Sequence, residues 1–325
     1  MAFWQDSNLL LIDGGLVPAG GGRTFPSIDP ATEAVVGESA DATAADAERA
    51  IRAARRAFDE TDWSTDPKRR AGCLRHLAAA MRDVLEELRE LTVREVGVPI
   101  SMTSGPALEG PIGLLDFYAD LAESYDGTVD LGPYEAYGGL HQRTVLREPY
   151  GVVSAISAYN YPTQLNLAKL GPALAGGCTV VLKGARHTPL ITLALGRLIA
   201  ERTDIPPGVV NVLASSAVEP GVVMTTDPDV DMVTFTGSTA VGRSIMAAAS
   251  ETLKKTFLEL GGKSALVVAV AKRIRTGTVS VNGGMWLAPD APVGGYKQSG
   301  IGRENGTAGL EEFLQTKLLA RPARG

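Results

Sequence analysis

Cysteine and histidine are scarce in this chain, and their scarcity excludes several kinds of protein. Its 325 residues include two cysteines, Cys73 and Cys178, and three widely spaced histidines. Two cysteines build neither a disulfide scaffold nor a zinc site, so we expect no metal. Cys178 begins an apolar run after two glycines, where a small buried thiol is expected rather than a nucleophile. The reducing cytoplasm is the default setting for so little cysteine.

Long hydrophobic runs and an excess of basic charge are missing too. No apolar run approaches the ~18 residues of a membrane span. The formal net charge of -6 argues against a nucleic-acid surface, which normally carries basic excess. The opening MAFWQDSNLLLIDGG lacks a basic stretch followed by a long apolar core, so we expect no signal peptide. Neither a membrane nor a nucleic acid is therefore an expected partner.

Helical periodicity dominates the first third of the chain. Apolar residues at helical spacing predict an amphipathic helix over 43–60, with Thr43 as its N-cap. A second helix is expected from Asp66 to about Glu90, and a third over roughly 109–126. Residues 127–149 alternate like two strands around a Gly-Gly pair, which predicts a β-hairpin that packs on another subunit as an arm.

From residue 150 onward, continuous apolar runs alternate with helical segments. This alternation predicts a parallel sheet that is covered on both faces, and so an α/β fold. Pro172 should disturb the helix in which it falls. Such a sheet binds its ligand at the carboxyl ends of its strands, near the point where the strand order reverses.

The segment VTFTGSTAVGRS (233–244) is a strand, a turn at Gly237 and a helix that opens near Ser238. Backbone N–H groups at such a helix start favour an anion such as a cofactor pyrophosphate. A plain strand-to-helix turn explains the glycine equally well, because the spacing departs from the dinucleotide fingerprint. The GGKS at 261–264 is no phosphate loop, since Phe257 stands where that motif needs glycine.

Three polar residues stand out near the expected strand ends. Lys183 could reach a ribose hydroxyl or phosphate, although a solvated loop lysine is the commoner case. Asn160 could donate to an oxyanion, although a turn asparagine before proline is locally favoured. Glu259, in the run LELGG, would be partly desolvated and suited to act as a general base, or would be a paired structural carboxylate.

Taken in order, YNYP, TVVLKGARHTP, FTGSTAVG, LELGGKS, GTVSVN and PVGGYKQSGIGRE resemble the aldehyde dehydrogenase superfamily. The resemblance implies a Rossmann-like doubly wound parallel sheet with N-terminal helices, a β-hairpin oligomerisation arm and a truncated catalytic domain. It divides the chain into 1–126 and 150–262 for the cofactor-binding domain, 127–149 for the hairpin, 263–300 for a catalytic remnant and 301–325 for a C-terminal oligomerisation segment.

The resemblance also implies chemistry and site residues. The family oxidises aldehydes to carboxylic acids with NAD or NADP, by way of a cysteine nucleophile. Asn160 would be the oxyanion donor and Glu259 the base. The expected cofactor-binding residues are Lys183, Arg186, Gly221, Phe235, Gly237, Ser238, Val241 and Leu260. A homo-oligomer is the expected assembly.

Two departures from the family pattern change the expectation. A segment of domain size, which should carry the nucleophilic cysteine, is missing between about Val268 and Ala271, so the chain should be impaired or inactive. The alternative function is a non-catalytic dinucleotide-binding or oligomerising remnant. Arg186 stands where many NAD-using members carry glutamate, so NADP should bind at least as well as NAD, unless Arg186 points to solvent. A short-chain reductase is set aside because no Tyr-x-x-x-Lys pair occurs.

Overall fold

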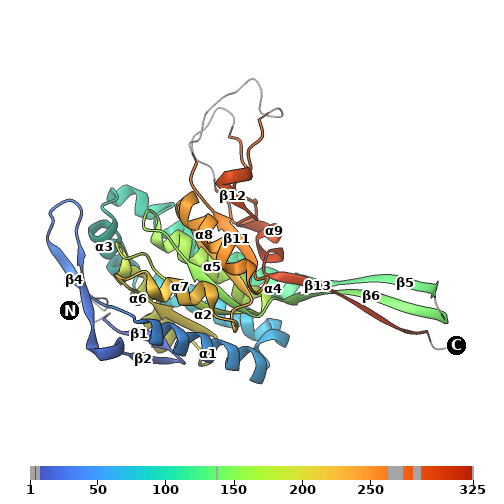
Figure 1. The fold of residues 1–325 in the computed structure, drawn as a ribbon. Coiled ribbons are helices and arrows are strands. Elements are labelled where there is room, and N and C mark those ends of the chain that lie inside the picture. The colour runs from blue at the N-terminus through green and yellow to red at the C-terminus, as the bar shows by residue number, and fades with distance from the viewer. Residues whose placement is uncertain (1–3, 5–7, 137, 263–273, 281–286, 324–325) are drawn as a thin grey trace.

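The computed structural model describes residues 4, 8–136, 138–262, 274–280 and 287–323. Its centre is an eight-stranded sheet in the order β12-β11-β10-β7-β8-β9-β1-β2 (Figure 1). Five of these strands are parallel: β7 (Val152–Ile156), β8 (Thr179–Lys183), β9 (Val210–Leu213), β10 (Met232–Thr236) and β11 (Lys255–Glu259). At the two edges, β1 (Leu10–Ile12), β2 (Gly15–Val17) and β12 (Gly300–Ile301) pair in antiparallel fashion. The predicted parallel sheet is confirmed.

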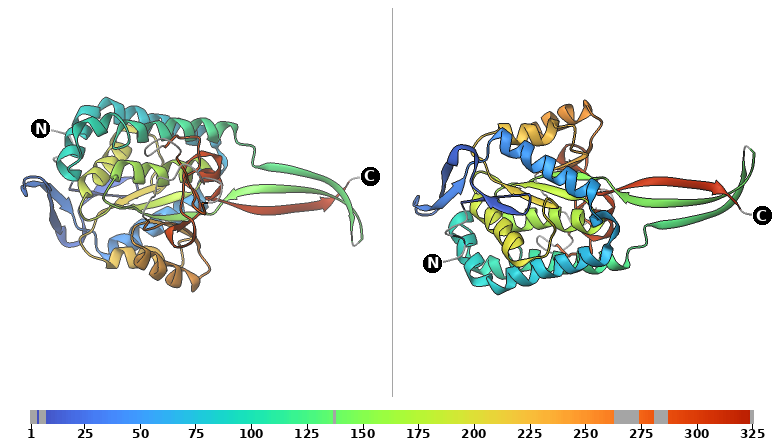
Figure 2. Two further views of the ribbon diagram at one scale, coloured as in Figure 1. Left: turned by 90° about the horizontal axis from the view of Figure 1, so that it is seen from above. Right: turned by 90° about the horizontal axis from the view of Figure 1, so that it is seen from below.

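Helices cover both faces of the sheet, as the two views of Figure 2 show. One face carries α1 (Ala44–Glu60), α7 (Glu219–Thr226) and α8 (Thr239–Ser250). The other carries α5 (Pro162–Gly176) and α6 (Pro189–Arg202), backed by α2 (Pro67–Asp83), α3 (Leu85–Val96) and α4 (Glu109–Ser124). Because helices lie on both faces, β7, β8 and β9 are buried almost throughout, which explains why their sequences are apolar without alternation.

The smaller elements complete the body of the molecule. They are β3 (Thr24–Ile28) paired with β4 (Val35–Ala40), α9 (Gly306–Glu311), and the short helices η2 (Gly20–Gly22), η3 (Trp63–Thr65), η4 (Ile100–Ser104) and η6 (Lys297–Ser299). None of the helices in the described part of the chain is long and apolar enough to cross a membrane.

The predicted first helix is confirmed together with its cap. The Thr43 side chain accepts from the Asp46 backbone N–H, and the Asp46 carboxylate accepts from the Thr43 N–H at 2.9 Å. This reciprocal pair satisfies two N–H groups that an uncapped helix would leave open. The Asp46 carboxylate also accepts from the Gly20 N–H, so the cap ties the N-terminal segment to α1.

The expectation of one helix from Asp66 to about Glu90 is wrong. The chain leaves the helical conformation at Val84, and α2 and α3 are separate helices. Glu86 and Glu87 lie in the first turn of α3, where carboxylates interact favourably with the positive end of a helix. The acidic pair that looked like helix interior therefore marks a second helix start.

Pro172 does not break α5, contrary to expectation. The helix continues to Gly176 and ends at Gly177 in the left-handed conformation. Almost all of α5 is buried, and Gly171 lies so close to Tyr118 that an added Cβ would approach its ring to 2.9 Å. Tertiary packing of this kind offsets the loss of one backbone hydrogen bond.

The predicted hairpin is present and projects from the body as an arm (Figure 1). Its strands are β5 (Thr128–Ala136) and β6 (Gly139–Pro149). The sequence did not reveal that β13 (Leu314–Pro322) pairs with β6 along nine residues, from Leu314 opposite Pro149 to Pro322 opposite His141. The arm is thus a three-stranded sheet that joins the end of the chain to its middle.

We expect the burial of α1 to contribute strongly to stability. Ile51 is fully buried between this helix and the sheet, so Ile51→Ala should lower the free energy of unfolding by about 2–5 kcal/mol. Ile100 is 65% exposed, and Ile100→Ala is the matched control with an expected change under about 0.5 kcal/mol. Urea denaturation followed by circular dichroism measures both, and equal losses would contradict this account of the core.

Candidate functional site at the carboxyl edge of the sheet

The strand order reverses at β7. This strand comes first along the chain among the parallel strands, with β8 on one side and β10 on the other. Backbone pairing places Ile156 of β7 level with Lys183 of β8 and with Phe235 of β10. The crevice beyond the carboxyl ends of β7 and β10 is therefore the place where an α/β sheet binds its ligand.

The structure puts the predicted glycine turn at this edge. The Gly237 N–H donates to the Glu259 carbonyl at 2.9 Å, which joins the ends of β10 and β11. A Cβ at Gly237 would lie 2.3 Å from the Phe235 ring, so only glycine fits without displacing that ring. Ser238 caps α8, and its hydroxyl accepts from the Val241 N–H at 3.3 Å. The turn thus has a tight-packing role, and it also directs the start of α8 toward the edge.

Apolar groups are exposed on α7 and α8, which contact each other. Val241 on α8 is 48% exposed, and Val222 on α7 is 50% exposed. A Cβ added at Gly221, which lies beside Val222, would meet no atom within 4 Å. Open space beside exposed valines suits a flat apolar group. The predicted Gly221 and Val241 thus lie on two neighbouring helices.

Lys183 ends β8 and is almost fully buried. Its Nζ donates to the Gly184 carbonyl at 3.3 Å. Burial lowers the pKa of the Lys183 ammonium, and Asp41 opposes that shift. A buried ammonium with so few partners at a ligand-binding edge has donors to offer to a hydroxyl or a phosphate.

Arg186 is exposed, and its Nε donates to His187 Nε2 at 3.3 Å. It lines a pocket of about 670 Å³ that also includes Tyr159, Thr188 and Ser216. The rings of Tyr159 and His187 meet edge to face at 5.5 Å. A cation and two aromatic rings at the rim of one pocket suit an anionic group that is attached to a flat ring.

Glu259 is the last residue of β11, and its environment is unusual for a carboxylate. Its Oε1 is buried without a hydrogen-bond partner among the described residues. Burial, together with the nearby Glu304, raises the pKa of Glu259 to about 8, against the influence of Lys169 and Arg303. A carboxyl group that titrates near neutral pH can both hold and release a proton, as a general base requires.

Sequence reasoning did not identify Lys169 and Glu304, which lie beside Glu259. Lys169 is fully buried in α5, and its Nζ lies 3.4 Å from Glu304 Oε1 and 3.2 Å from Thr234 Oγ1. A lysine between the apolar residues Ala168 and Leu170 of α5 was the one available signal. Glu304 gave none, because the fold alone brings it across 135 residues to Lys169.

Asn160 and Leu260 complete the predicted set. Asn160 is exposed in the turn between β7 and α5, four residues beyond the last residue of β7. The Leu260 N–H donates to the Ser299 carbonyl at 2.9 Å, and its side chain packs on α8 where Gly242 leaves room. Both lie at the same edge as Glu259. This edge therefore gathers residues from every strand end between β8 and β11.

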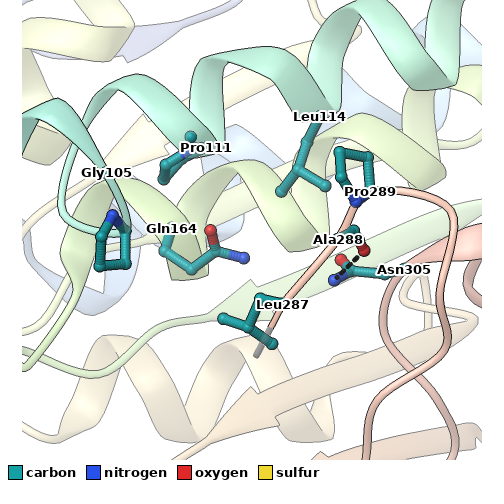
Figure 3. Close-up of a pocket in the computed structure, with 10 residues that line it drawn as sticks. Gly105, Pro111, Leu114, Gln164, Leu287, Ala288, Pro289 and Asn305 are labelled. Carbon is teal, nitrogen blue, oxygen red and sulfur yellow. Dashed lines mark hydrogen bonds between the residues drawn. The ribbon is translucent and has the colours of Figure 1, made fainter. Parts of the chain in front are cut away.

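A smaller pocket of about 300 Å³ opens beside the start of α5 (Figure 3). Gln164 in the first turn of α5 projects into it, opposite Leu287 and Asn305. Pro111 and Leu114 on α4 form another wall. Its lining residue Gln164 follows Asn160 by four positions in the sequence.

Neither cysteine is placed to act at this edge. Cys178 directly precedes β8 and therefore lies at the amino end of a strand whose carboxyl end is Lys183. Both thiols are fully buried, and burial raises the pKa of Cys73 to about 12 and that of Cys178 to about 11. The thiolate is the nucleophile, so neither group is reactive at neutral pH. The described residues also contain no group of three acidic, histidine or cysteine residues that could hold a metal ion.

The description "Aldehyde dehydrogenase family" belongs to a family profile that matches residues 17–271 and, separately, residues 268–319. The chain belongs to the aldehyde dehydrogenase family. It is 40% identical over 269 residues to betaine aldehyde dehydrogenase 1 of Oryza sativa subsp. japonica, covering 80% of this chain and 52% of the relative. It is 35% identical over 278 residues to the NADP/NAD-dependent aldehyde dehydrogenase PuuC of Escherichia coli, covering 82% of this chain and 55% of that relative.

Solved structures show the same fold. A betaine aldehyde dehydrogenase from Staphylococcus aureus, solved in complex with NAD+, matches with a TM-score of 0.90 at 23% identity, over 97% of this chain and 94% of that chain. By sequence, in contrast, this aldehyde dehydrogenase chain spans about half the length of the curated relatives that it matches. The residues where the two profile matches meet, 268–271, lie outside the described residues.

The Glu259 environment predicts a pH dependence of stability. A carboxyl whose folded pKa is about 8 rather than 4.5 keeps its proton longer in the folded chain, so stability falls as pH rises from about 4.5 through about 8. Buried Glu95, whose pKa is raised to about 7, adds a loss of the same sign. Glu259→Gln should therefore flatten the unfolding free energy across this range relative to the parent chain.

Urea titrations at half-unit pH intervals measure this effect. Glu251→Gln, at an exposed position after α8, is the control and should keep the parent slope. A Glu259→Gln curve parallel to that of the parent chain would show that Glu259 ionises freely in the folded state.

Proposed function

We propose that this chain is the dinucleotide-binding part of an NAD(P)-dependent aldehyde dehydrogenase that lacks the segment with the nucleophilic cysteine. The observation that carries the proposal is the pair of family matches, 17–271 and 268–319, which meet at residues 268–271. The two matches follow one another along the chain and have their boundary at 268–271, which supports the loss of an internal segment at that point.

The cofactor fits the groups that the carboxyl edge presents. The start of α8 at Gly237 and Ser238 would hold the pyrophosphate, since helix starts favour anions. The space between α7 and α8, at Gly221 and Val241, would take the adenine ring. Lys183 would donate to the adenine ribose. Phe235 and Leu260 pack beneath this surface and fix the glycine turn and α8, respectively.

The catalytic roles follow from position and protonation. Asn160, exposed beyond β7, would donate its amide N–H to a developing oxyanion. Glu259 would take a proton from water, and with a pKa of about 8 this capacity grows from pH 7 upward. Lys169 would favour the ionised form of Glu259, and Glu304, which pairs with Lys169, would oppose it. A bound nicotinamide would supply the hydride acceptor.

The reaction of the family is the oxidation of an aldehyde to a carboxylic acid. We propose that this chain carries two of the groups for that reaction, the oxyanion donor and the base, but not the nucleophile. Its oxyanion donor and its base are present at the edge. Its two cysteines are buried, and burial keeps both thiols protonated at neutral pH. We therefore propose that this chain binds the cofactor but does not carry out thiol-dependent turnover by itself. A small aldehyde would enter by the pocket beside Gln164.

Assembly and location complete the proposal. The arm exposes apolar side chains, among them Val129, Tyr134 and Leu318, so a second copy of the chain would cover them as a homo-oligomer. Sedimentation of the purified chain as a monomer would contradict this.

We also propose a division of the chain into domains at 1–126, 127–149, 150–262, 263–300 and 301–325. Of these, 263–273 and 281–286 lie outside the described residues. Two buried thiols suit a reducing cytoplasm.

With Arg186 at this position, the chain should bind NADP more tightly, relative to NAD, than it would with a carboxylate there. Arg186→Glu should weaken NADP binding by about tenfold or more relative to NAD, because an arginine–phosphate pair is replaced by repulsion. Arg202→Glu, an equal charge change at the exposed end of α6, is the control and should leave the ratio of the two dissociation constants unchanged. Isothermal titration calorimetry measures that ratio. An unchanged ratio in Arg186→Glu would mean that Arg186 points away from the ribose.

The proposed function is tested by separating binding from turnover. The purified chain, verified by an intact mass of 34.0 kDa, should bind NAD or NADP in calorimetry. It should show no aldehyde oxidation that depends on a thiol, since loss of a nucleophile costs several powers of ten in rate. Reduced nicotinamide formation with propanal, before and after iodoacetamide, measures this. Turnover that stops on alkylation of Cys73 or Cys178 would refute the proposal.

A further inference from the structure

The pocket beside Gln164 has a distinctive chemistry (Figure 3). Its volume of about 300 Å³ suits a small molecule, and Pro111, Leu114 and Leu287 supply apolar walls. Two amide side chains, those of Gln164 and Asn305, supply the polar groups. The described residues that line it include no carboxylate, no basic group and no aromatic ring.

Asn305 is a buried polar group with unused capacity. It is 2% exposed, and its Nδ2 donates to the Ala288 carbonyl at 3.3 Å. Its Oδ1 has no partner among the described residues. A buried acceptor without a partner costs free energy, and a donor on a ligand would recover it. The backbone of Asn305 is held at φ 63° and ψ 164°, a conformation that residues other than glycine rarely adopt. The surrounding structure must therefore hold Asn305 in this position.

The start of α5 adds a second constraint. Gln164 lies in the first turn of this 15-residue helix, and the N-cap residue Tyr161 makes no side-chain cap. Unsatisfied N–H groups at a helix start give partial positive charge, which repels cations and favours lone pairs. Three acidic residues directly adjoin lining residues in the sequence, namely Glu109, Asp290 and Glu304, and none of them is among the described residues that line the pocket. Glu109 pairs with Arg89, and Glu304 is buried against Lys169.

These groups together disfavour a cationic ligand. An ammonium group that entered the pocket would lose its hydration and find neither a carboxylate nor an aromatic face among the described lining residues. A hydroxyl or a carboxamide would donate to Asn305 Oδ1 and could exchange hydrogen bonds with Gln164. Among the described lining residues, selection against the charged compound thus comes from the lack of a group that would replace the hydration of an ammonium, while Asn305 Oδ1 and Gln164 can bind an uncharged one.

We propose that this pocket selects an aldehyde whose far end carries an uncharged hydrogen-bonding group, such as a hydroxyl or a carboxamide, and rejects one that carries an ammonium group. The assignment of the ligand as an aldehyde rests on the proposed function. The selection by charge rests on the pocket alone.

The test uses alcohols, which lack a carbonyl that would react with lysines. Saturation-transfer NMR titrations of the full chain with 1,4-butanediol and with 4-aminobutan-1-ol compare compounds of equal length. We expect the diol to bind about tenfold or more tightly than the amino alcohol, and Gln164→Glu to reverse that order. Gln315→Glu, the same change on the exposed face of β13, should leave the order as in the parent chain.

Each outcome decides the matter. Preference of the parent chain for the amino alcohol, or equal binding of both, would overturn the selection by charge. Failure of both compounds to bind would overturn the pocket as a ligand site. An unaltered order in Gln164→Glu would mean that Gln164 does not face the ligand. Diol binding in a chain that binds neither NAD nor NADP would keep the pocket and refute the proposed function.

Discussion

Parallel pairing of β7 with both β8 and β10 is the constraint on which the rest of the structure depends. It brings Ile156, Lys183 and Phe235 into one row, so the residues that follow each strand emerge at one edge. Asn160, Gly237 and Glu259 are separated by up to 99 positions in the sequence, yet they belong to adjoining strand ends. Such a sheet is stable only when both faces are covered, and α1 and α5 supply part of that cover.

Burial then sets the chemistry of this edge. Glu259 and Lys183 lie where desolvation disfavours their charged forms, so the carboxyl pKa rises while the ammonium pKa falls. Lys169 and Glu304 form a buried pair beside Glu259 and influence its charge in opposite directions. Perturbed groups gathered at a strand-order reversal are typical of a functional site. The two thiols, in contrast, are buried where desolvation outweighs the groups that favour a thiolate.

The family relationship and the shortened sequence point in different directions, and the structure shows how both can hold. Within the described residues, the sheet, its helices and the arm are joined to one another, because β13 pairs with β6 and β12 pairs with β11. The residues proposed to bind the cofactor, among them Lys183 and Gly237, lie on these elements. If the chain lacks the segment with the nucleophile, as we propose, cofactor binding and catalysis would be separable.

The sequence by itself determined the parallel α/β sheet, the capped first helix, the hairpin and the polar residues at strand ends, because each depends on local periodicity or on a short motif. It failed at Val84 and Pro172, where local propensity competes with helix-end charge and with packing. Only the tertiary structure decided that β13 joins the arm, that Glu304 meets Lys169, and that Asn305 and Gln164 face one pocket. These contacts join segments more than a hundred residues apart, and such pairings are set by the packing of the whole chain.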